Sequence, residues 1–163
     1  MKYIIYIAML MVAAGSCKKT STADPEIVSQ FVKEVKANRY EGSQELPAFG
    51  FEHIDALLSH ASDEQLVSRF PWSPILSYYP GQKEVGLVML YAIEVIRSPG
   101  NYPARGVLVV DANDRERKVS LGEVLPRYQT WWAEHKGKSV AQLRQLNPLE
   151  GTGLVWFGTE VPE

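Results

Sequence analysis

Residues 82–97 read QKEVGLVMLYAIEVIR, and they decide the fold. The 12 residues 85–96 contain one charged side chain, that of Glu94, and leave almost no polar face. A helix that is apolar all round is a buried helix, so the pattern predicts a central helix over about 82–97. Crossing a membrane takes about 20 apolar residues, so this run belongs to the core of a domain.

Helices are also predicted before this segment. Asp24-Pro25-Glu26 is a typical helix start, and the apolar residues that follow recur at helical spacing up to a stop at 41–43. A shorter helix is expected over 51–59. Ser62 and Gln65 form a capping-box pattern. It predicts another helical turn, with Leu66 and Val67 facing inward. One more short helical segment is expected over 73–79.

The segment after the central helix predicts strands and then a broken helix. An apolar strand at 107–110, a turn and a return at 117–119 predict a minor β-hairpin. Ser120 with Glu123 is a second capping box. Pro126 cannot continue a helix without a kink, so a new helical segment is expected to begin near it.

The last part of the chain adds a short helix over 139–146 and an apolar tail at 154–157 that is expected to dock on the body. Together the elements predict a mainly α fold. It is a compact orthogonal bundle of short helices around the buried helix at 82–97, with the minor hairpin at 107–119. Residues 24–163 are expected to form a single globular domain.

Residues 1–16 have the three parts of a secretory signal peptide. Lys2 supplies the positive charge, residues 3–14 form an apolar run, and Ala14-Gly15-Ser16 provides the small side chains of a cleavage site. The run of 12 residues is too short to remain as a membrane-spanning anchor.

Cys17 follows directly and is the only cysteine of the chain. Its position resembles the lipobox of bacterial lipoproteins, in which the thiol receives a diacylglycerol before cleavage makes the cysteine the new N-terminus. The resemblance implies lipidation of Cys17, attachment to a membrane through the lipid, and a flexible tether over 17–23. The absence of Asp after Cys17 favours the outer membrane and leaves its face undecided. The alternative is an ordinary secreted protein with an incidental cysteine.

Charge and cysteine content exclude several functions. Without Lys2 the chain has 16 basic and 19 acidic side chains, a formal charge of −3, and its one basic cluster is Lys18-Lys19. Nucleic-acid binding needs a concentrated positive surface, so it is excluded, and the two lysines are expected against anionic lipid headgroups. With Cys17 lipidated, no thiol remains for a disulfide, a metal or catalysis.

Glu94 is the most unusual single residue, because a lone carboxylate is expensive to bury in an apolar helix. One interpretation makes it a general acid or base at a pocket. The favoured interpretation is a structural ion pair with Arg97, one turn on, or with Arg105. No other catalytic residue is assigned, since the chain has no Gly-x-Ser-x-Gly motif and Gly151-Thr152-Gly153 lacks the Lys of a phosphate loop.

A pair of histidines and a pair of tryptophans are two further candidate binding sites. His53 and His60 are seven residues apart, about 10 Å along a helix, which suits neither a shared metal nor another cofactor. Trp131 and Trp132 differ by about 100° around a helix, so both cannot easily lie in the central core. One interpretation exposes one of them as a platform for a sugar ring or a partner protein. The favoured interpretation is that both fill gaps between short helices.

The stretches 46–62, 70–79, 86–97 and 147–156 together resemble a family of small lipoproteins from gut Bacteroides-type bacteria, known only as a domain of unknown function. The resemblance implies one lipid-anchored domain and no particular activity. The first hypothesis is therefore a non-enzymatic binding or accessory module of the cell envelope, with a protein or glycan as partner. The alternatives are a small hydrolase or lyase with a site near Glu94, or a structural envelope protein.

Overall fold

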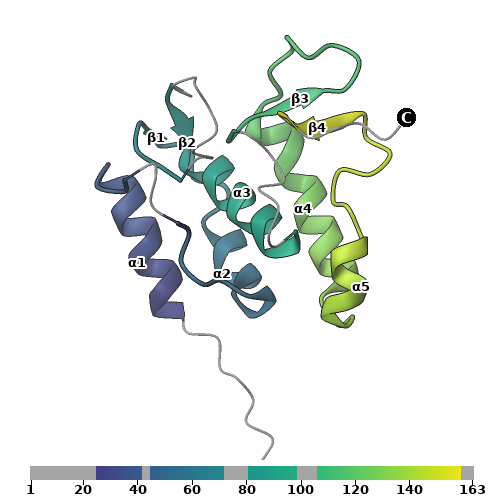
Figure 1. Ribbon diagram of the computed structural model, residues 1–163, viewed down its shortest axis with the longest axis horizontal. Helices are drawn as coiled ribbons and strands as arrows, with labels where there is room; N and C mark the ends of the chain where they lie inside the picture. The colour runs from purple at the N-terminus through teal and green to yellow at the C-terminus, as the bar shows by residue number, and fades with distance from the viewer. Residues whose placement is uncertain (1–24, 42–44, 72–80, 99–105, 159–163) are drawn as a thin grey trace, which may run out of the picture.

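The computed structural model describes residues 25–41, 45–71, 81–98 and 106–158 (Figure 1). Within these ranges the chain forms five α-helices, one short 3-10 helix and two antiparallel sheets of two strands each. The predicted mainly α fold with a minor hairpin is confirmed. The expected signal, the tether and the helical segment at 73–79 lie outside the described residues.

The central helix, α3 (Val85–Arg97), is confirmed as the core of the molecule. All of its residues except Val95 and Arg97 are buried. It contacts α1 and α2 on one side and α4 on the other, and Figure 1 shows it between these helices. The helix begins three residues later than expected, because Lys83–Glu84 form strand β2.

Helix α1 (Pro25–Lys36) packs its predicted apolar stripe into the core: Val28, Phe31, Val32 and Val35 are buried. It ends earlier than the predicted stop at 41–43. Asn38 takes a left-handed conformation with φ of 53°, which Asn tolerates better than most residues. The Asn38 side chain accepts hydrogen bonds from the backbone N–H groups of Ser68 and Arg69, at 2.7 and 3.2 Å, and so fixes this turn to a distant segment.

The predicted helix over 51–59 is confirmed as a 3-10 turn, η1 (Phe51–His53), followed by α2 (Ile54–Ser59). The predicted helical turn over 62–67 is wrong. Leu66–Val67 form strand β1, which pairs with β2, so that Val67 is buried and Leu66 is 54 % exposed. The side chain of Asp63 accepts the N–H of Gln65 at 2.9 Å, an Asx turn in place of the capping box.

Strand β3 (Val109–Asp111) has two neighbours. The predicted return of the chain at 117–119 is present as a single bridge between Val110 and Lys118. The longer pairing is with β4 (Leu154–Trp156), which is how the predicted docking of the tail takes place. On this strand the ring of Trp156 packs edge-on against Tyr91 of α3, with centroids 5.8 Å apart.

Helix α4 (Leu121–His135) begins at the predicted capping box of Ser120 and Glu123. The predicted new segment at Pro126 is wrong, because α4 continues through it. A proline removes the hydrogen bond to the carbonyl four residues earlier, here that of Gly122. Gly122 and Pro126 are both exposed, so water can reach the carbonyl of Gly122. The last helix, α5 (Val140–Gln145), is capped by Ser139 as predicted. No helix in the described ranges is long and apolar enough to cross a membrane.

Candidate functional site

Glu94 lies inside the core, with 3 % of its surface exposed, and both of its carboxylate oxygens have partners. Arg97 Nε donates to Oε2 at 3.0 Å, and Arg97 Nη2 forms an ion pair with Oε1. The hydroxyl of Tyr128 on α4 donates to Oε2 at 3.1 Å and accepts the indole N–H of Trp156 at 2.8 Å. The buried charge is therefore balanced and fully hydrogen-bonded, which is the requirement for keeping it in a core.

This network matches the structural interpretation of Glu94. Of its two predicted partners, Arg97 is found, and Arg105 lies outside the described residues. Burial, together with the negative charge of Glu94, raises the pKa of Tyr128 well above its usual value. A general acid or base must be reached by a substrate, and Glu94 is 3 % exposed and hydrogen-bonded at both oxygens.

Trp131 and Trp132 are both buried, at 5 and 7 % exposure, which matches the favoured interpretation that they fill gaps and not the alternative of an exposed platform. Figure 1 places α4 between α3 and α5, so more than one side of the helix is covered. The indole N–H of Trp132 donates to Asp55 on α2 at 2.7 Å, and the two indole rings pack with centroids 5.7 Å apart. The pair fills the space between helices, and its role in binding stays a prediction.

His53 is 7 % exposed, and its Nδ1 accepts the backbone N–H of Gly50 at 2.9 Å. His60, at the end of α2, is only partly exposed. Among the residues that the structure describes, no three side chains of His, Cys, Asp or Glu gather where they could hold a metal ion. The histidines are therefore part of the packing around α2.

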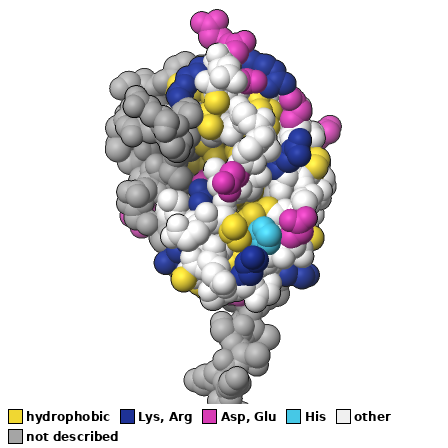
Figure 2. Space-filling view, turned by 90° about the vertical axis from the view of Figure 1, so that its right-hand side faces the viewer, with side chains coloured by type: hydrophobic (Ala, Val, Ile, Leu, Met, Phe, Trp, Pro, Cys, Tyr) yellow, Lys and Arg dark blue, Asp and Glu magenta, His cyan; other side chains and the backbone are white. Residues whose placement is uncertain are grey.

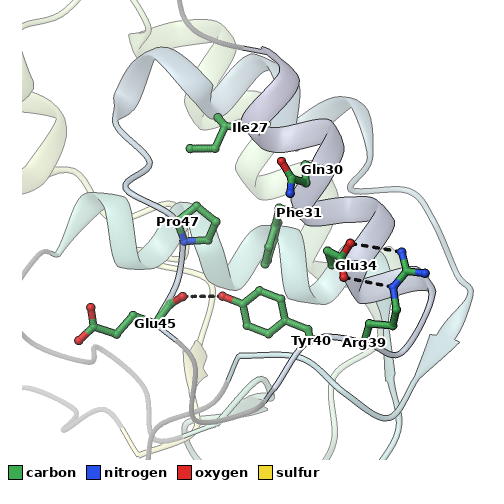
Figure 3. Close-up of a pocket in the computed structure, with 8 residues that line it drawn as sticks. All are labelled: Ile27, Gln30, Phe31, Glu34, Arg39, Tyr40, Glu45 and Pro47. Atoms are coloured by element: carbon green, nitrogen blue, oxygen red, sulfur yellow. Dashed lines mark hydrogen bonds and ion pairs between the residues drawn. The ribbon is translucent and has the colours of Figure 1, made fainter.

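A groove along α1 is one of the hollows that the described residues line (Figure 3). It is a hollow of about 430 Å³ between one face of α1 and the segment that follows this helix. We call it the α1 groove, and it is lined by Ile27, Gln30, Phe31, Glu34, Arg39, Tyr40, Glu45 and Pro47. The four α1 residues recur at helical spacing, which places them on one side of the helix.

The wall of the groove opposite α1 is held by Tyr40. Its ring meets Phe31 edge to face, with centroids 5.3 Å apart, and its hydroxyl donates to the carbonyl of Glu45 at 2.6 Å. Burial of the ring raises the pKa of Tyr40 to about 12. These contacts hold the segment around Glu45 and Pro47 at a fixed position beside α1.

The rim of the α1 groove is polar, and part of it is uncommitted. Arg39 donates two hydrogen bonds of 3.2 Å to the carboxylate of Glu34, which closes one end (Figure 3). The side chains of Gln30 and Glu45 are exposed, and neither has a hydrogen-bond partner among the described residues. The groove thus combines a partly apolar interior with the exposed amide of Gln30, whereas the carboxylate of Glu45 points away from α1 (Figure 3).

A second hollow, of about 420 Å³, lies beside the first turns of α4. Arg117 crosses it and contacts the carboxylates of Asp111 and Glu123. The backbone N–H of Ser120, together with the hydrogen bond from Arg117, lowers the pKa of Glu123. On the face shown in Figure 2, charged side chains of both signs alternate with small apolar patches. Arg127 also lines the second hollow, is exposed, and has no hydrogen-bond or ion-pair partner among the described residues.

The α1 groove was not predicted from the sequence. Ile27 and Phe31 were identified as core residues, and the polar residues Gln30, Arg39 and Glu45 were not identified at all. Only the position of Gln30 on the edge of the apolar stripe could have indicated it. Whether that edge is covered depends on the turn at Asn38, which brings the following segment back along α1.

The structure is a mainly α domain with a buried, saturated polar network and a groove along its first helix. Residues 22–157 match the family described as a domain of unknown function, DUF4943, and the chain belongs to this family. No curated protein and no solved structure matches the chain. The resemblance to a domain of unknown function is thereby confirmed.

Proposed function

We propose that this chain is a lipid-anchored protein of the bacterial cell envelope, and that its domain is a non-enzymatic binding or accessory module whose binding site is the α1 groove. The observation that carries the proposal is the contrast between two sets of polar groups. The carboxylate of Glu94 is buried and bonded at both oxygens, whereas the amide of Gln30 is exposed at a preformed groove and has no partner among the described residues. Ligand sites are typically preformed hollows with a few such groups.

The lipid anchor rests on the sequence. A basic residue, an apolar run and Ala14-Gly15-Ser16 precede Cys17, which fits a lipoprotein of the type found in Bacteroides-like bacteria. Lipidation of Cys17 would attach the domain to the membrane, with the outer membrane favoured. Seven residues separate Cys17 from Pro25, and a chain spans at most about 3.5 Å per residue, so α1 begins within about 30 Å of the lipid. A partner in the α1 groove would therefore lie close to the membrane surface.

The alternative, a small hydrolase or lyase, needs an acid or base that is open to substrate. Glu94 was its candidate, and the described lining residues of both hollows do not include Glu94. A rearrangement that exposed it would also break its bonds to Arg97 and Tyr128. The binding module requires no such rearrangement.

Site-specific photo-crosslinking in the native cells tests the binding site. A photoreactive amino acid replaces Gln30 in the α1 groove, and in a matched control it replaces Gln129, which is exposed on α4. A single, stoichiometric adduct at position 30, absent at position 129 and reduced in Cys17→Ser cells, is the expected result. Equal labelling at both positions, or none at position 30, would refute the α1 groove as the binding site.

Mass spectrometry of the membrane fraction tests the anchor independently. The expected N-terminal peptide begins at Cys17 and has the mass of attached acyl chains. A mature N-terminus elsewhere, or an unmodified Cys17, would contradict the anchor and leave the proposal for the groove standing.

A further inference from the structure

We infer that the corner between α4 and α5 docks on the membrane that holds the lipid anchor, through contacts with the anionic headgroups of its phospholipids. We call residues 135–144 the basic corner. The inference rests on the proposed lipid anchor and is independent of the α1 groove. It adds a second point of attachment, which gives the domain one preferred orientation on the membrane.

The basic corner has positive charge that no carboxylate neutralises. Its charged side chains are Lys136, Lys138 and Arg144, and the sequence has no Asp or Glu from 135 to 149. All three are exposed, and none has an ion-pair partner in the described part of the chain. Three basic and no acidic side chains give the corner a formal charge of +3, whereas the whole chain has a formal charge of −2.

Helix stability accounts for only part of this charge. Lys136 is at the C-terminal end of α4, where the helix dipole favours a cation. Lys138 directly precedes Ser139, the N-cap of α5, and the dipole disfavours a cation at that end. The first turn of α5 has no acidic residue to compensate. The charge of Lys138 therefore does not stabilise its own helix, and an anionic surface outside the protein complements it.

An exposed apolar side chain lies within the same corner. Val140 is 46 % exposed at the first position of α5, and Arg144 follows it by four residues, on the same side of the helix. An apolar side chain among basic ones fits the membrane interface, because it can enter the acyl boundary while the cations stay at the level of the headgroups. The exposed Leu66 lacks this setting, since Asp63 and Glu64 precede it.

Hydrogen bonds hold the basic corner in place. Arg97 Nη1 donates to the carbonyl of Arg144 at 3.1 Å, which ties the end of α5 to α3. The N–H of Lys138 donates to the carbonyl of His135 at 2.8 Å, within the turn. The surface is thus formed by a fixed backbone, so docking does not have to order this turn.

The position of the basic corner suits contact with the anchoring membrane. Figure 1 shows the turn between α4 and α5, and the first turn of α1, towards the lower end of the molecule, whereas β1 and the loop after β3 lie at the upper end. The seven residues between Cys17 and Pro25 reach at most about 30 Å. A domain of this size is roughly 35 Å across. One membrane surface can therefore contact the corner while the lipid stays inserted.

Fluorescence quenching in lipid nanodiscs tests the docking. With Cys17 acylated the chain has no other thiol, so Val140→Cys can be labelled at a single position with the fluorophore NBD. Leu66→Cys, in β1 at the upper end of the molecule, is the matched exposed control. The purified lipoprotein is placed in phosphatidylcholine discs that contain a quenching nitroxide lipid, with or without about 30 % of the anionic lipid phosphatidylglycerol.

NBD at position 140 should be quenched in the anionic discs, and the quenching should be lost in neutral discs and at high salt, which screens the attraction. NBD at position 66 should stay unquenched in both kinds of disc. This pattern would show that the domain contacts anionic lipid through the basic corner in one orientation.

Removal of charge tests the contribution of the lysines. Lys136→Gln combined with Lys138→Gln should lower the ratio of docked to undocked domain by about 25-fold, since each lysine near an anionic surface contributes about fivefold. The matched control is Arg69→Gln combined with Arg115→Gln, which removes two exposed charges next to β1 and in the loop after β3. It should leave the quenching unchanged, and an unaltered thermal unfolding curve shows that each variant is folded.

The inference is overturned by equal quenching in neutral and anionic discs, by no quenching at position 140, or by equal quenching at positions 66 and 140. Quenching that survives the loss of both lysines overturns it as well. Mass spectrometry of the same sample separates this result from the proposed function. If Cys17 is acylated and position 140 is not quenched, the anchor stands and only the docking is lost. If Cys17 is unmodified, the anchor and the docking are refuted together.

Discussion

Tyr128 of α4 donates its hydroxyl proton to the carboxylate of Glu94 on α3 across 3.1 Å, inside the core. The same hydroxyl accepts the indole N–H of Trp156, so one oxygen joins three elements that are far apart in the sequence. Hydrogen bonds in a low-dielectric interior strengthen one another, and a missing member leaves its partners unsatisfied.

Tyr128→Phe should lower the free energy of unfolding by about 1–3 kcal/mol, because it removes from the core a hydrogen bond to the carboxylate of Glu94 and the acceptor of the Trp156 indole N–H. Urea denaturation followed by tryptophan fluorescence measures the loss. A Tyr128→Phe protein as stable as the parent would show that the network does not stabilise the fold.

Glu94→Gln should destabilise more, by about 3–5 kcal/mol, because it leaves the guanidinium of Arg97 mostly buried without a carboxylate. Glu134→Gln, at an exposed position on α4, is the control and should have little effect. The opposite pattern, full stability of Glu94→Gln together with loss of a binding or catalytic activity, would restore Glu94 as a functional residue.

Gly86→Ala should be among the most damaging small substitutions, at about 3 kcal/mol. A Cβ at Gly86 would overlap the carbonyl oxygen of Ala61 and lie 2.7 Å from Leu121, so α3 would have to move away from the turn after α2 and from the start of α4. Gly122→Ala is the matched control on α4, where the nearest described atom is 3.9 Å away. It should stabilise the protein by about 0.5–1 kcal/mol through helix propensity. Thermal unfolding of both variants checks the pair.

Trp132→Phe should cost about 1–2 kcal/mol more than Trp131→Phe, although the two indoles are adjacent and similarly buried. Trp132 loses a hydrogen bond to Asp55, whereas the indole N–H of Trp131 has no partner in the described part of the chain. Chemical denaturation compares them directly. Equal losses of stability in the two variants would mean that the hydrogen bond from Trp132 to Asp55 contributes nothing and that only the ring volume matters.

The stability of the fold should fall in acid, in part through Asp63. The hydrogen bond from Lys36, with that from the N–H of Gln65, lowers the pKa of Asp63 in the folded state. Its contribution is therefore present above the ordinary pKa of Asp, about 4, and is lost as pH falls through the lowered value. Asp63→Asn should be less stable than the parent at pH 7, by about 0.5 kcal/mol for such an exposed pair, and equal to it at pH 2. A difference that stays constant with pH would contradict this.

The elements whose signals are local were predictable from the sequence. The buried helix α3 follows from its own apolar residues, and the starts of α4 and α5 follow from capping boxes that need only four neighbouring residues. The same local pattern failed at Ser62 and Gln65, because Lys83–Glu84 returns from further along the chain and pairs with Leu66–Val67. A distant strand partner leaves no trace in a window of four residues.

The candidate site was beyond sequence reasoning for the same reason. Sequence periodicity indicated that Phe31 is buried, but not that Glu45 and Pro47 lie beside it. That neighbourhood depends on the turn at Asn38 and on the hydrogen bond from Tyr40 to Glu45, two contacts outside any periodic element. The ion pair of Glu94 could be predicted as far as Arg97, which is on the same helix, whereas Tyr128 is on another element.

The position of β4 near the C-terminal end of the described chain also has a consequence for the order of synthesis. Trp156 is made long after Tyr91 and Tyr128, yet it covers both of them. A chain emerging from the ribosome therefore cannot complete its core until β4 has left the exit tunnel, even though domains otherwise begin to form from their N-terminal parts. If the precursor is exported as proposed, this late closure keeps the chain open while it is threaded through the membrane.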